Sequence, residues 1–381
     1  MRLKHFLIAI TFSLLLAPCV LLAQPKPAKH EFAQEIQRNF REWDRNGDSR
    51  LSEDEIDRVV TDPKVKGRAA AAAAALELTL RNKKFNLPPL TRDYLVSAPS
   101  GIPDTPDYER SFQSALTKIN KTPRNLFSNG KPHREMLHQG RMGDCFFLAP
   151  FGALLHRDAN VVKEMIQQKE DGNFQVKFKG AKPITVTPLT DAELALSASN
   201  EGDGLWVSLF EKAYAELRNE QLPSDKQKVL ATDLIAAGGN SGRVIEILTD
   251  HETKSIGFRT REAKDQPLTG DALLKKLDQL RPVLMAACTN HHLITAGTPE
   301  TVTTPGVKPK HAYAVLGFDA KKDEIILWNP HGNSFKPKGS PGVANGYVTT
   351  KGDFVMPLRE FVQVFRSVTF ETGKTQMKKS K

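Results

Sequence analysis

The most informative part of this sequence is the stretch HQGRMGDCFFLAPFGALL, residues 138–155. Its apolar side chains recur at helical spacing from Cys145 onward, and Asp144 stands where a helix N-cap is expected. A helix that begins there holds the Cys145 thiol in its first turn, where unpaired backbone N–H groups and the helix dipole stabilise a thiolate. We therefore predict that Cys145 is a nucleophile with a lowered pKa. The alternative is a buried structural cysteine at a helix start.

Gln139 lies on the loop before this helix, close enough to Cys145 for the loop to return its side-chain amide to the thiol. Together with the backbone N–H of Cys145, that amide could donate to the oxyanion that forms when a thiolate attacks a carbonyl. Gly140 and Gly143 leave room for a substrate chain to approach. We predict that Gln139 stabilises an oxyanion.

A base for the thiol is expected in KHAYAVLGFDAKKDEIILWNPHGN, residues 310–333. This stretch predicts two short strands joined by a polar turn centred near Ala320. If the strands pair antiparallel about that centre, Tyr313 faces Leu327 and His311 faces Asn329.

An asparagine side-chain oxygen opposite a histidine would hold the imidazole in the tautomer that accepts a thiol proton. We therefore predict that His311 is the base and that Asn329 orients it. The alternative is that His311 is an ordinary solvated histidine. His291 and His292 have no asparagine in matching register, so we expect them to be loop residues.

The string DRNGDSRLSEDE, residues 44–55, has the spacing of an EF-hand calcium loop between two expected helices at 31–43 and 54–61. The expected calcium ligands are the side chains of Asp44, Asn46, Asp48 and Glu55 and the carbonyl of Arg50. Ser49 occupies the position where glycine normally makes the sharp turn, so we expect reduced affinity. The alternative is an acidic, solvated turn that binds no metal.

The N-terminus predicts a secretory signal, because Arg2 and Lys4 precede an apolar run at 6–16 and a small-residue exit at Ala23. An uncleaved anchor and a lipoprotein signal at Cys19 are the alternatives. We expect an exported protein, periplasmic or secreted, without stable membrane insertion after the signal is removed.

The composition excludes some classes of protein. The 381 residues are 39% hydrophobic, which is enough for a globular core. The formal charge is +10, but the sequence shows no basic face interleaved with aromatic residues, so we expect no nucleic-acid partner. After signal removal only Cys145 and Cys288 remain, and a structural disulfide is not expected.

The chain divides by pattern into six segments. They are a signal peptide (1–23), an EF-hand and alanine-rich helical region (24–97), a linker and core entry (98–124), a helical subdomain with the nucleophile (125–240), a β-rich subdomain with the histidine and asparagine (241–370), and a basic tail (371–381). We expect an α+β fold with a cleft between the helical and β-rich halves.

Four segments, in order, resemble the protease core of the calpain family of cysteine peptidases. They are QGRMGDCFFLAP at 139–150, GLWVSLFEKAYAEL at 204–217, HAYAVLGFD at 311–319 and WNPHGN at 328–333. The resemblance covers about residues 125–366. It implies a papain-like fold with a helical and a β-barrel-like subdomain, and hydrolysis of protein or peptide substrates through a thioester.

The resemblance also implies the matching roles for Gln139, Cys145, His311 and Asn329. Phe146 and His331 stand where the family usually has tryptophan, and we expect His331 to leave the catalytic pair wetter. Within the EKAYA segment, Trp206, Leu209 and Tyr214 have helical spacing and are expected to pack in the core. Two other functions stay open: an inactive calcium-binding interaction module, and an acyl transferase of the transglutaminase type.

Overall fold

The structure is a computed structural model that describes residues 30–128, 130–198, 202, 204–259 and 266–373. The expected signal peptide and most of the expected basic tail lie outside the described residues. Among the described residues, no helix combines the length and the apolar character needed to cross a membrane.

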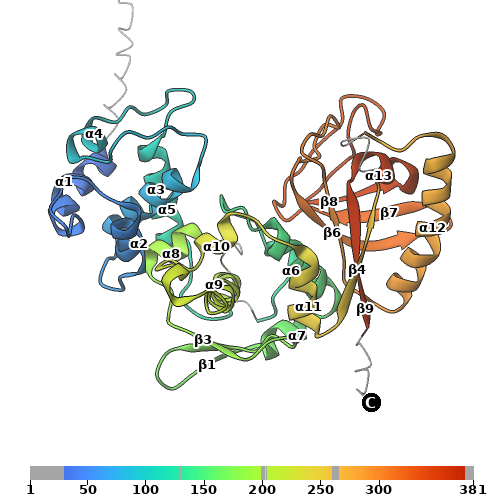
Figure 1. Ribbon diagram of the computed structural model, residues 1–381, viewed down its shortest axis with the longest axis horizontal. Helices are drawn as coiled ribbons and strands as arrows, with labels where there is room; N and C mark the ends of the chain where they lie inside the picture. The colour runs from blue at the N-terminus through green and yellow to red at the C-terminus, as the bar shows by residue number, and fades with distance from the viewer. Residues whose placement is uncertain (1–29, 129, 199–201, 203, 260–265, 374–381) are drawn as a thin grey trace, which may run out of the picture.

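The N-terminal part of the chain is a group of helices, drawn in blue to blue-green in Figure 1. The helices are α1 (Glu31–Trp43), α2 (Glu53–Thr61), α3 (Gly67–Arg81), α4 (Arg92–Ser97) and α5 (Tyr108–Lys121). The predicted helix at 31–43 is confirmed, and so is the one at 54–61, which begins one residue earlier at a Ser52–Glu55 capping box. The alanine run forms α3, where small side chains let neighbouring helices approach closely.

The N-terminal helices are packed onto the helical half of the molecule. Helix α3 packs against α5 and α8 (Asp191–Leu196), and one hydrophobic core joins the N-terminal helices to Ala192 and Leu196 of α8. The Thr190 hydroxyl donates to the carbonyl of Val60 at 2.6 Å, and the backbone N–H of Gly67 donates to Asp191 at 2.8 Å. The segment expected as linker and core entry contains α5, which belongs to this shared core.

The helical half carries a small sheet at its lower edge in Figure 1. Its further elements are η1 (Arg134–Met136), α6 (Cys145–Arg157), α7 (Ala159–Glu164), β1 (Ile166–Gln168), β2 (Phe174–Val176), β3 (Ile184–Val186), α9 (Trp206–Asn219), η2 (Ser224–Lys226), α10 (Asp233–Ala236) and α11 (Ser241–Thr249). The strands form an antiparallel sheet in the order β1-β2-β3.

The β-rich half is built on a six-stranded antiparallel sheet in the order β4-β9-β5-β6-β7-β8. Its elements are β4 (Glu252–Gly257), α12 (Gly270–Thr289), β5 (Ile294–Gly297), β6 (Ala312–Asp319), β7 (Glu324–Trp328), β8 (Asp353–Pro357), α13 (Leu358–Val364) and β9 (Ser367–Gly373). The outer strands β4 and β8 do not pair with each other, so the sheet is open. The expected barrel-like closure is not seen in the described part of the chain.

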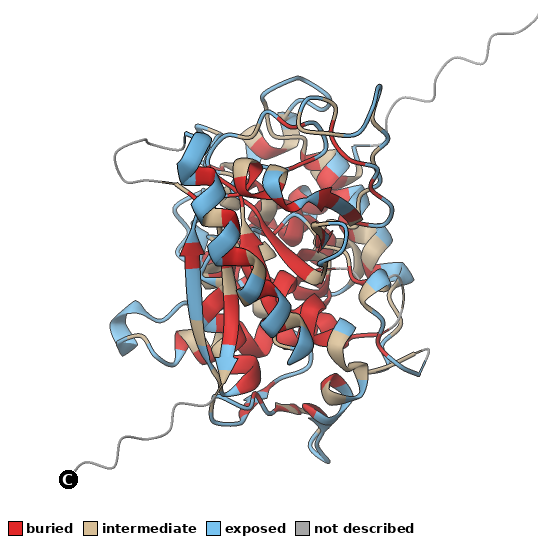
Figure 2. Ribbon diagram, turned by 90° about the vertical axis from the view of Figure 1, so that its right-hand side faces the viewer, coloured by how far each residue is buried: buried red, intermediate tan, exposed pale blue. Residues whose placement is uncertain are grey.

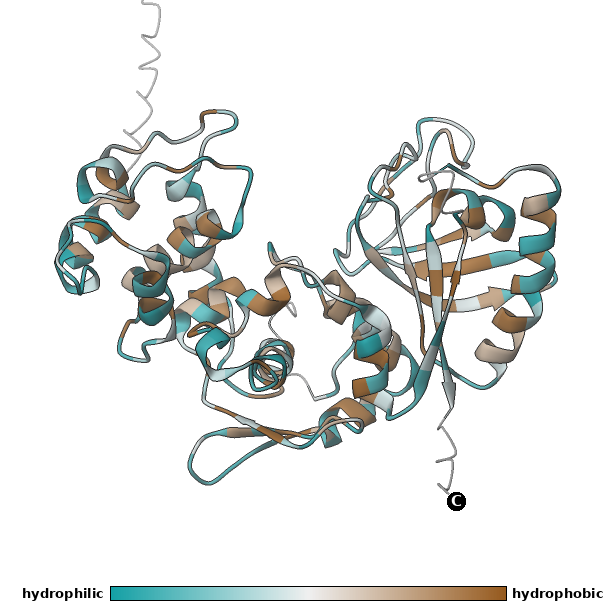
Figure 3. Cartoon of the chain, viewed as in Figure 1, coloured by the Kyte–Doolittle hydropathy of each residue, from teal (hydrophilic) through white to brown (hydrophobic). Residues whose placement is uncertain are grey.

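Helices α12 and α13 cover the sheet of the β-rich half and share its hydrophobic core. Leu273, Leu277, Leu280 and Leu284 of α12 are buried at helical spacing. Figure 2 shows buried residues gathered on the strands and on the faces of the helices turned toward them, and Figure 3 shows the same segments as the hydrophobic ones. The sequence pattern of short strands broken by glycine and proline did not reveal α12.

The predicted register of the β6–β7 hairpin is wrong. Leu327 pairs with Val315 rather than with Tyr313, and a bulge falls between Val315 and Gly317. The turn lies at residues 320–323, later than the predicted centre, with Asp323 in a left-handed conformation (φ 57°). The Asp319 carboxylate accepts backbone N–H groups inside this turn, which stabilises it there.

Candidate active site

Cys145 is the first residue of α6, and the predicted position of the thiol in the first helical turn is confirmed. The helix is almost entirely buried along its length in the core of the helical half, and it packs against β6 of the other half. Cys145 therefore lies at the boundary between the two halves. Cys145 and Cys288 are both free thiols.

His311 and Asn329 lie side by side, in spite of the wrong register prediction. The His311 Nε2 and the Asn329 Oδ1 are 2.7 Å apart. His311 directly precedes β6 and Asn329 directly follows β7, so the two side chains lie diagonally across the end of the hairpin. Both residues are buried.

The thiol of Cys145 lies beside the histidine segment. The backbone N–H of Ala312, the residue after His311, donates a hydrogen bond to this thiol. The structure thus places the predicted nucleophile, from the helical half, beside the residue that follows the predicted base in the β-rich half.

Burial dominates the electrostatics of this site. It raises the pKa of the Cys145 thiol, the N–H of Ala312 opposes that rise, and the Asp144 carboxylate adds to it. Burial lowers the pKa of His311 to about 3, assisted by the neighbouring His331 and opposed by the bond to Asn329. The predicted lowering of the thiol pKa is therefore wrong: the apolar surroundings outweigh the helix N-terminus, and both groups are neutral at pH 7.

Gln139 occupies a different arrangement from the predicted one. Its side-chain Nε2 donates to the carbonyl of Met142 at 2.7 Å, within the loop before Cys145. Its backbone N–H donates to the carbonyl of Pro330 at 2.7 Å, which ties this loop to the residue after Asn329. The side-chain Oε1 is buried and accepts no hydrogen bond from the described residues.

Asp144 is the N-cap residue of α6, but its carboxylate makes no capping hydrogen bond. Asp144 is instead fully buried beside Glu211 of α9, and burial raises the pKa of both carboxyls. The interaction with Asp144 raises the pKa of Glu211 further, so Glu211 is the member of the pair that holds a proton. The cap prediction failed because Asp144 faces another acid across the core.

His331 is a residue of the site whose contribution the sequence did not reveal. Its ring stacks on the ring of His311 with centroids 4.8 Å apart and an angle of 15° between the planes. The side chain of His311 is thereby covered, and His311 is only 7% exposed. The expectation that His331 leaves the histidine wetter is wrong.

Asn333 is a second such residue. Its Oδ1 accepts the side-chain Nδ2 of Asn329 at 2.7 Å, which fixes the Asn329 amide with its oxygen toward His311. The sequence signal was present, because Asn333 ends the WNPHGN segment, but only the folded turn shows its partner.

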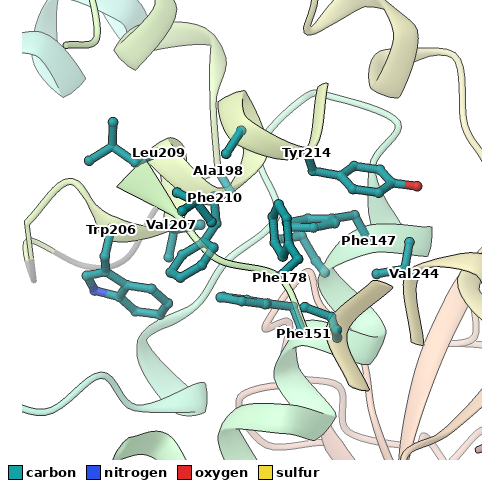
Figure 4. Close-up of a cluster of buried hydrophobic side chains, with 14 of the residues drawn as sticks. Phe147, Phe151, Phe178, Ala198, Trp206, Val207, Leu209, Phe210, Tyr214 and Val244 are labelled. Atoms are coloured by element: carbon teal, nitrogen blue, oxygen red, sulfur yellow. The ribbon is translucent and has the colours of Figure 1, made fainter. Parts of the chain in front are cut away.

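The EKAYA segment forms α9, and its predicted role in the core is confirmed. Trp206, Leu209 and Tyr214 are buried in one cluster with Phe147 and Phe151 of α6, as Figure 4 shows. Tyr214 stacks on Phe147 with ring centroids 4.9 Å apart. This packing holds the helix that carries Cys145.

The loop at 44–55 joins α1 to α2, and Ser49 adopts the left-handed conformation that the expected calcium loop requires there (φ 67°). Glu55 accepts the backbone N–H groups of Arg45 and Asn46 at 2.8 and 3.2 Å, so the end of the loop folds back onto its start. Asp44 Oδ1 is buried and accepts no hydrogen bond from the described residues.

The carboxylates of this loop do not gather closely. Asp48 is paired with Arg50 at 2.9 Å, and Asn46 bonds to Asp48. The loop is not isolated either, because Arg50 forms a β-bridge with Thr91, which precedes α4. The oxygen donors and backbone conformation fit a hard cation, and the side chains would have to turn toward it.

Comparisons with known proteins agree with this geometry. A sequence model of the family described as calpain family cysteine protease matches residues 114–370. The chain belongs to the calpain family of cysteine proteases.

Three curated relatives match at modest identity. Calpain-type cysteine protease DEK1 of Arabidopsis thaliana is 27% identical over 207 residues, which is 50% of this chain and 8% of that protein. Calpain-13 of Rattus norvegicus is 27% identical over 241 residues, 56% of this chain and 32% of that protein. Calpain-type cysteine protease ADL1 of Oryza sativa subsp. japonica is 26% identical over 206 residues, 50% of this chain and 8% of that protein. The matched regions span less than a third of these relatives.

Proposed function

We propose that this chain is an exported cysteine endopeptidase that hydrolyses peptide bonds through a thioester on Cys145. One observation supports this above all: His311 is bonded to Asn329 at 2.7 Å while the next residue, Ala312, bonds to the thiol of Cys145. A thiol, an imidazole and an orienting amide in this order are the minimal set for acyl transfer.

The reaction begins from a neutral thiol and a neutral imidazole. Because Nε2 of His311 is engaged by Asn329, Nδ1 is the nitrogen left to accept the thiol proton. The sulfur attacks the peptide carbonyl as that proton moves to His311, and His311 then gives it to the leaving amine. Water, deprotonated by the same imidazole, cleaves the thioester and restores the thiol.

The backbone N–H of Cys145, at the start of α6, is available to stabilise the oxyanion. Gln139 is the proposed second donor, with one N–H of its amide on Met142 and the other free to donate.

We also propose that the loop at 44–55 binds calcium. The ligands would be Asp44, Asn46, Asp48, Glu55 and the carbonyl of Arg50. Support comes from the buried, unbonded Oδ1 of Asp44 and from the left-handed Ser49. Bound calcium would supply a charged anchor for the α1–α2 turn, and a direct part in hydrolysis is not proposed.

Export is proposed from the sequence of residues 1–23 alone. Two free thiols and no disulfide in the described chain are compatible with a protein that keeps a reactive cysteine outside the cell. Mass spectrometry of the secreted or periplasmic fraction would locate the mature N-terminus near residue 24.

The test of the proposed function is cleavage of casein, an unstructured substrate, by the chain from residue 24. Cys145→Ala should abolish cleavage. Cys288→Ser is the control, because it removes the other free thiol, which has no part in the proposed mechanism, and it should leave cleavage unchanged. An amine acceptor added to the same reaction separates transfer from hydrolysis. Cleavage that survives in Cys145→Ala would refute the mechanism, and no cleavage by any variant would favour the inactive binding module.

A further inference from the structure

Three carboxylates from separate elements meet where the N-terminal helices contact the protease core. They are Asp57 of α2, Glu77 of α3 and Asp233 of α10, and one oxygen of each lies within 4.8 Å of the others. Asp57 and Glu77 precede residue 114, where the match to the protease family begins. Two of the three carboxylates therefore lie outside the matched region, and Asp233 lies inside it.

One cation side chain bonds to this cluster. Arg81 Nε lies 2.8 Å from Glu77 Oε1, and Arg81 Nη2 lies 2.7 Å from Asp233 Oδ1. Glu53 and Lys228 act on Asp57 from outside the cluster in opposite directions. If all three carboxylates were ionised, they and the Arg81 guanidinium together would carry two negative charges, which Lys228 offsets only from outside the cluster.

Two of the remaining oxygens are buried and have no hydrogen-bond partner in the described part of the chain. They are Asp57 Oδ1 and Glu77 Oε2, on residues that are 2% and 1% exposed. Burial, with the charge of Asp233, raises the pKa of Asp57 to about 7, and burial raises the pKa of Glu77 to about 8. An uncompensated buried carboxylate costs several kcal/mol, so these groups either hold protons or share a positive partner.

We propose that Asp57, Glu77 and Asp233 bind a hard divalent cation that joins the N-terminal helices to the protease core. The donors are all carboxylate oxygens, the ligand type that calcium, magnesium and manganese prefer. A divalent ion that displaced the protons of Asp57 and Glu77 would balance the net charge of the three carboxylates and Arg81. Oxygens up to 4.8 Å apart can converge on a central ion with bonds of about 2.0–2.6 Å.

The cluster is connected to the loop that precedes the nucleophile. Arg81 Nη2 bonds to the Thr232 hydroxyl at 3.0 Å, and Arg81 Nη1 lies 3.8 Å from the sulfur of Met142. Met142 is the residue whose carbonyl accepts the Gln139 amide. A side chain at Gly143 would overlap the carbonyl of Ala236 in α10, so this loop and α10 are in direct contact.

A cation in the cluster would hold α2, α3 and α10 together and fix Arg81 against the nucleophile loop. This site is separate from the calcium loop at 44–55, whose ligands lie before α2 or at its first turn. It does not rest on the proposed peptidase activity, since cation binding can be measured on an inactive chain.

The test is manganese binding to the chain from residue 24 carrying Cys145→Ala, which prevents self-cleavage. Electron paramagnetic resonance reports free Mn²⁺, and Asp44→Asn weakens the loop so that the cluster is observed alone. We expect that chain to bind one Mn²⁺, and Asp57→Asn or Glu77→Gln to weaken its binding by more than about tenfold. The matched control Asp225→Asn, an exposed acid outside the cluster, should bind as the parent does.

Folding is checked separately, because Asn and Gln remove a buried charge and should keep the fold without metal. Mn²⁺ should raise the Tm of the Asp44→Asn chain and leave that of Asp44→Asn/Asp57→Asn unchanged. Two results would overturn the proposal: no manganese bound by the Asp44→Asn chain, or binding unchanged by both cluster substitutions. Either result would mean that the carboxyls hold protons instead of a cation. The proposed peptidase function would still stand, because casein cleavage tests it independently.

Discussion

His331 performs the covering role that tryptophan usually has in this family, with a side chain that can itself titrate. Its ring lies flat on His311, and burial lowers the pKa of His331 to about 4. At neutral pH both rings are therefore uncharged and can stack without repulsion. In acid each one opposes protonation of the other, which lowers the pH at which the base is lost.

The pH profile of the peptidase follows from this pair. The proposed mechanism requires neutral His311, so kcat/KM should fall only as pH drops well below 6.5, the ordinary range of imidazole. In His331→Ala the exposed His311 should have a higher pKa, the acid limb should move upward, and kcat/KM should drop about tenfold. His331→Trp should keep the rate, and an acid limb in the parent at or above pH 6.5 would contradict this account.

The acid pair beneath the nucleophile makes a prediction about stability. Burial raises the pKa of Glu211 in the folded chain, so the folded state binds more protons than the unfolded state. The contribution to stability is therefore greatest below the unfolded pKa and is lost as pH rises toward the folded pKa. We expect the free energy of unfolding to decline between pH 5 and pH 8.

Glu211→Gln mimics the protonated side chain and should reduce this decline, measured by urea unfolding at the two pH values. Glu211→Ala leaves the Ala198 N–H and the buried Asp144 without their partner, and should destabilise by about 1–3 kcal/mol at pH 5. An identical pH dependence in the parent and Glu211→Gln would show that this pair does not hold the proton.

Candidate site residues could be chosen from the sequence where the choice depends on residue type and order, and their catalytic roles stay predictions. Cys145, His311 and Asn329 could be selected from the sequence because each stands in a segment with a helix start or a strand end. The directions of the pKa shifts of Cys145 and His311 could not be predicted, because burial depends on which distant segments cover these side chains, such as His331 on His311.

The hairpin of β6 and β7 shows what the sequence predicts of a pair of strands and what it does not. Both strands were predicted, but their register depends on one bulge and on the place of the turn, and neither follows from alternation of side chains. His311 and Asn329 still meet because diagonal neighbours across a strand pair also come into contact.

The contact between α6 and β7 also depends on one glycine. A methyl group at Gly152 of α6 would overlap the ring of Trp328, the residue before Asn329. Gly152→Ala should therefore destabilise the protein by about 1–3 kcal/mol and lower kcat by displacing Asn329. Thermal unfolding and casein cleavage measure both effects.

Gly257→Ala is the matched control, because a methyl group at Gly257 meets no atom within 4 Å. It should change neither property. Equal Tm values for the two variants would mean that the α6–Trp328 contact tolerates an added methyl group.

At the scale of the whole molecule, the helical half of the protease is joined to the N-terminal helices through a shared core and through Arg81. The division into helical and β-rich halves was visible in the sequence as a change of pattern near residue 240. The docking of the N-terminal helices was not, because the alanines of α3 show no amphipathic face and the helix is buried on most sides. The open sheet was not predicted either, because the sequence does not show whether the outer strands β4 and β8 pair with each other.

The account depends most on acyl transfer to one sulfur, which can be observed by trapping. The chain from residue 24 is mixed with an activated peptide ester, quenched in acid within the first turnover, and digested for mass spectrometry. The account predicts an acyl group on the peptide that contains Cys145, none on Cys288, and loss of the adduct in His311→Ala. Turnover with no adduct on Cys145, or equal acylation in His311→Ala, would contradict it.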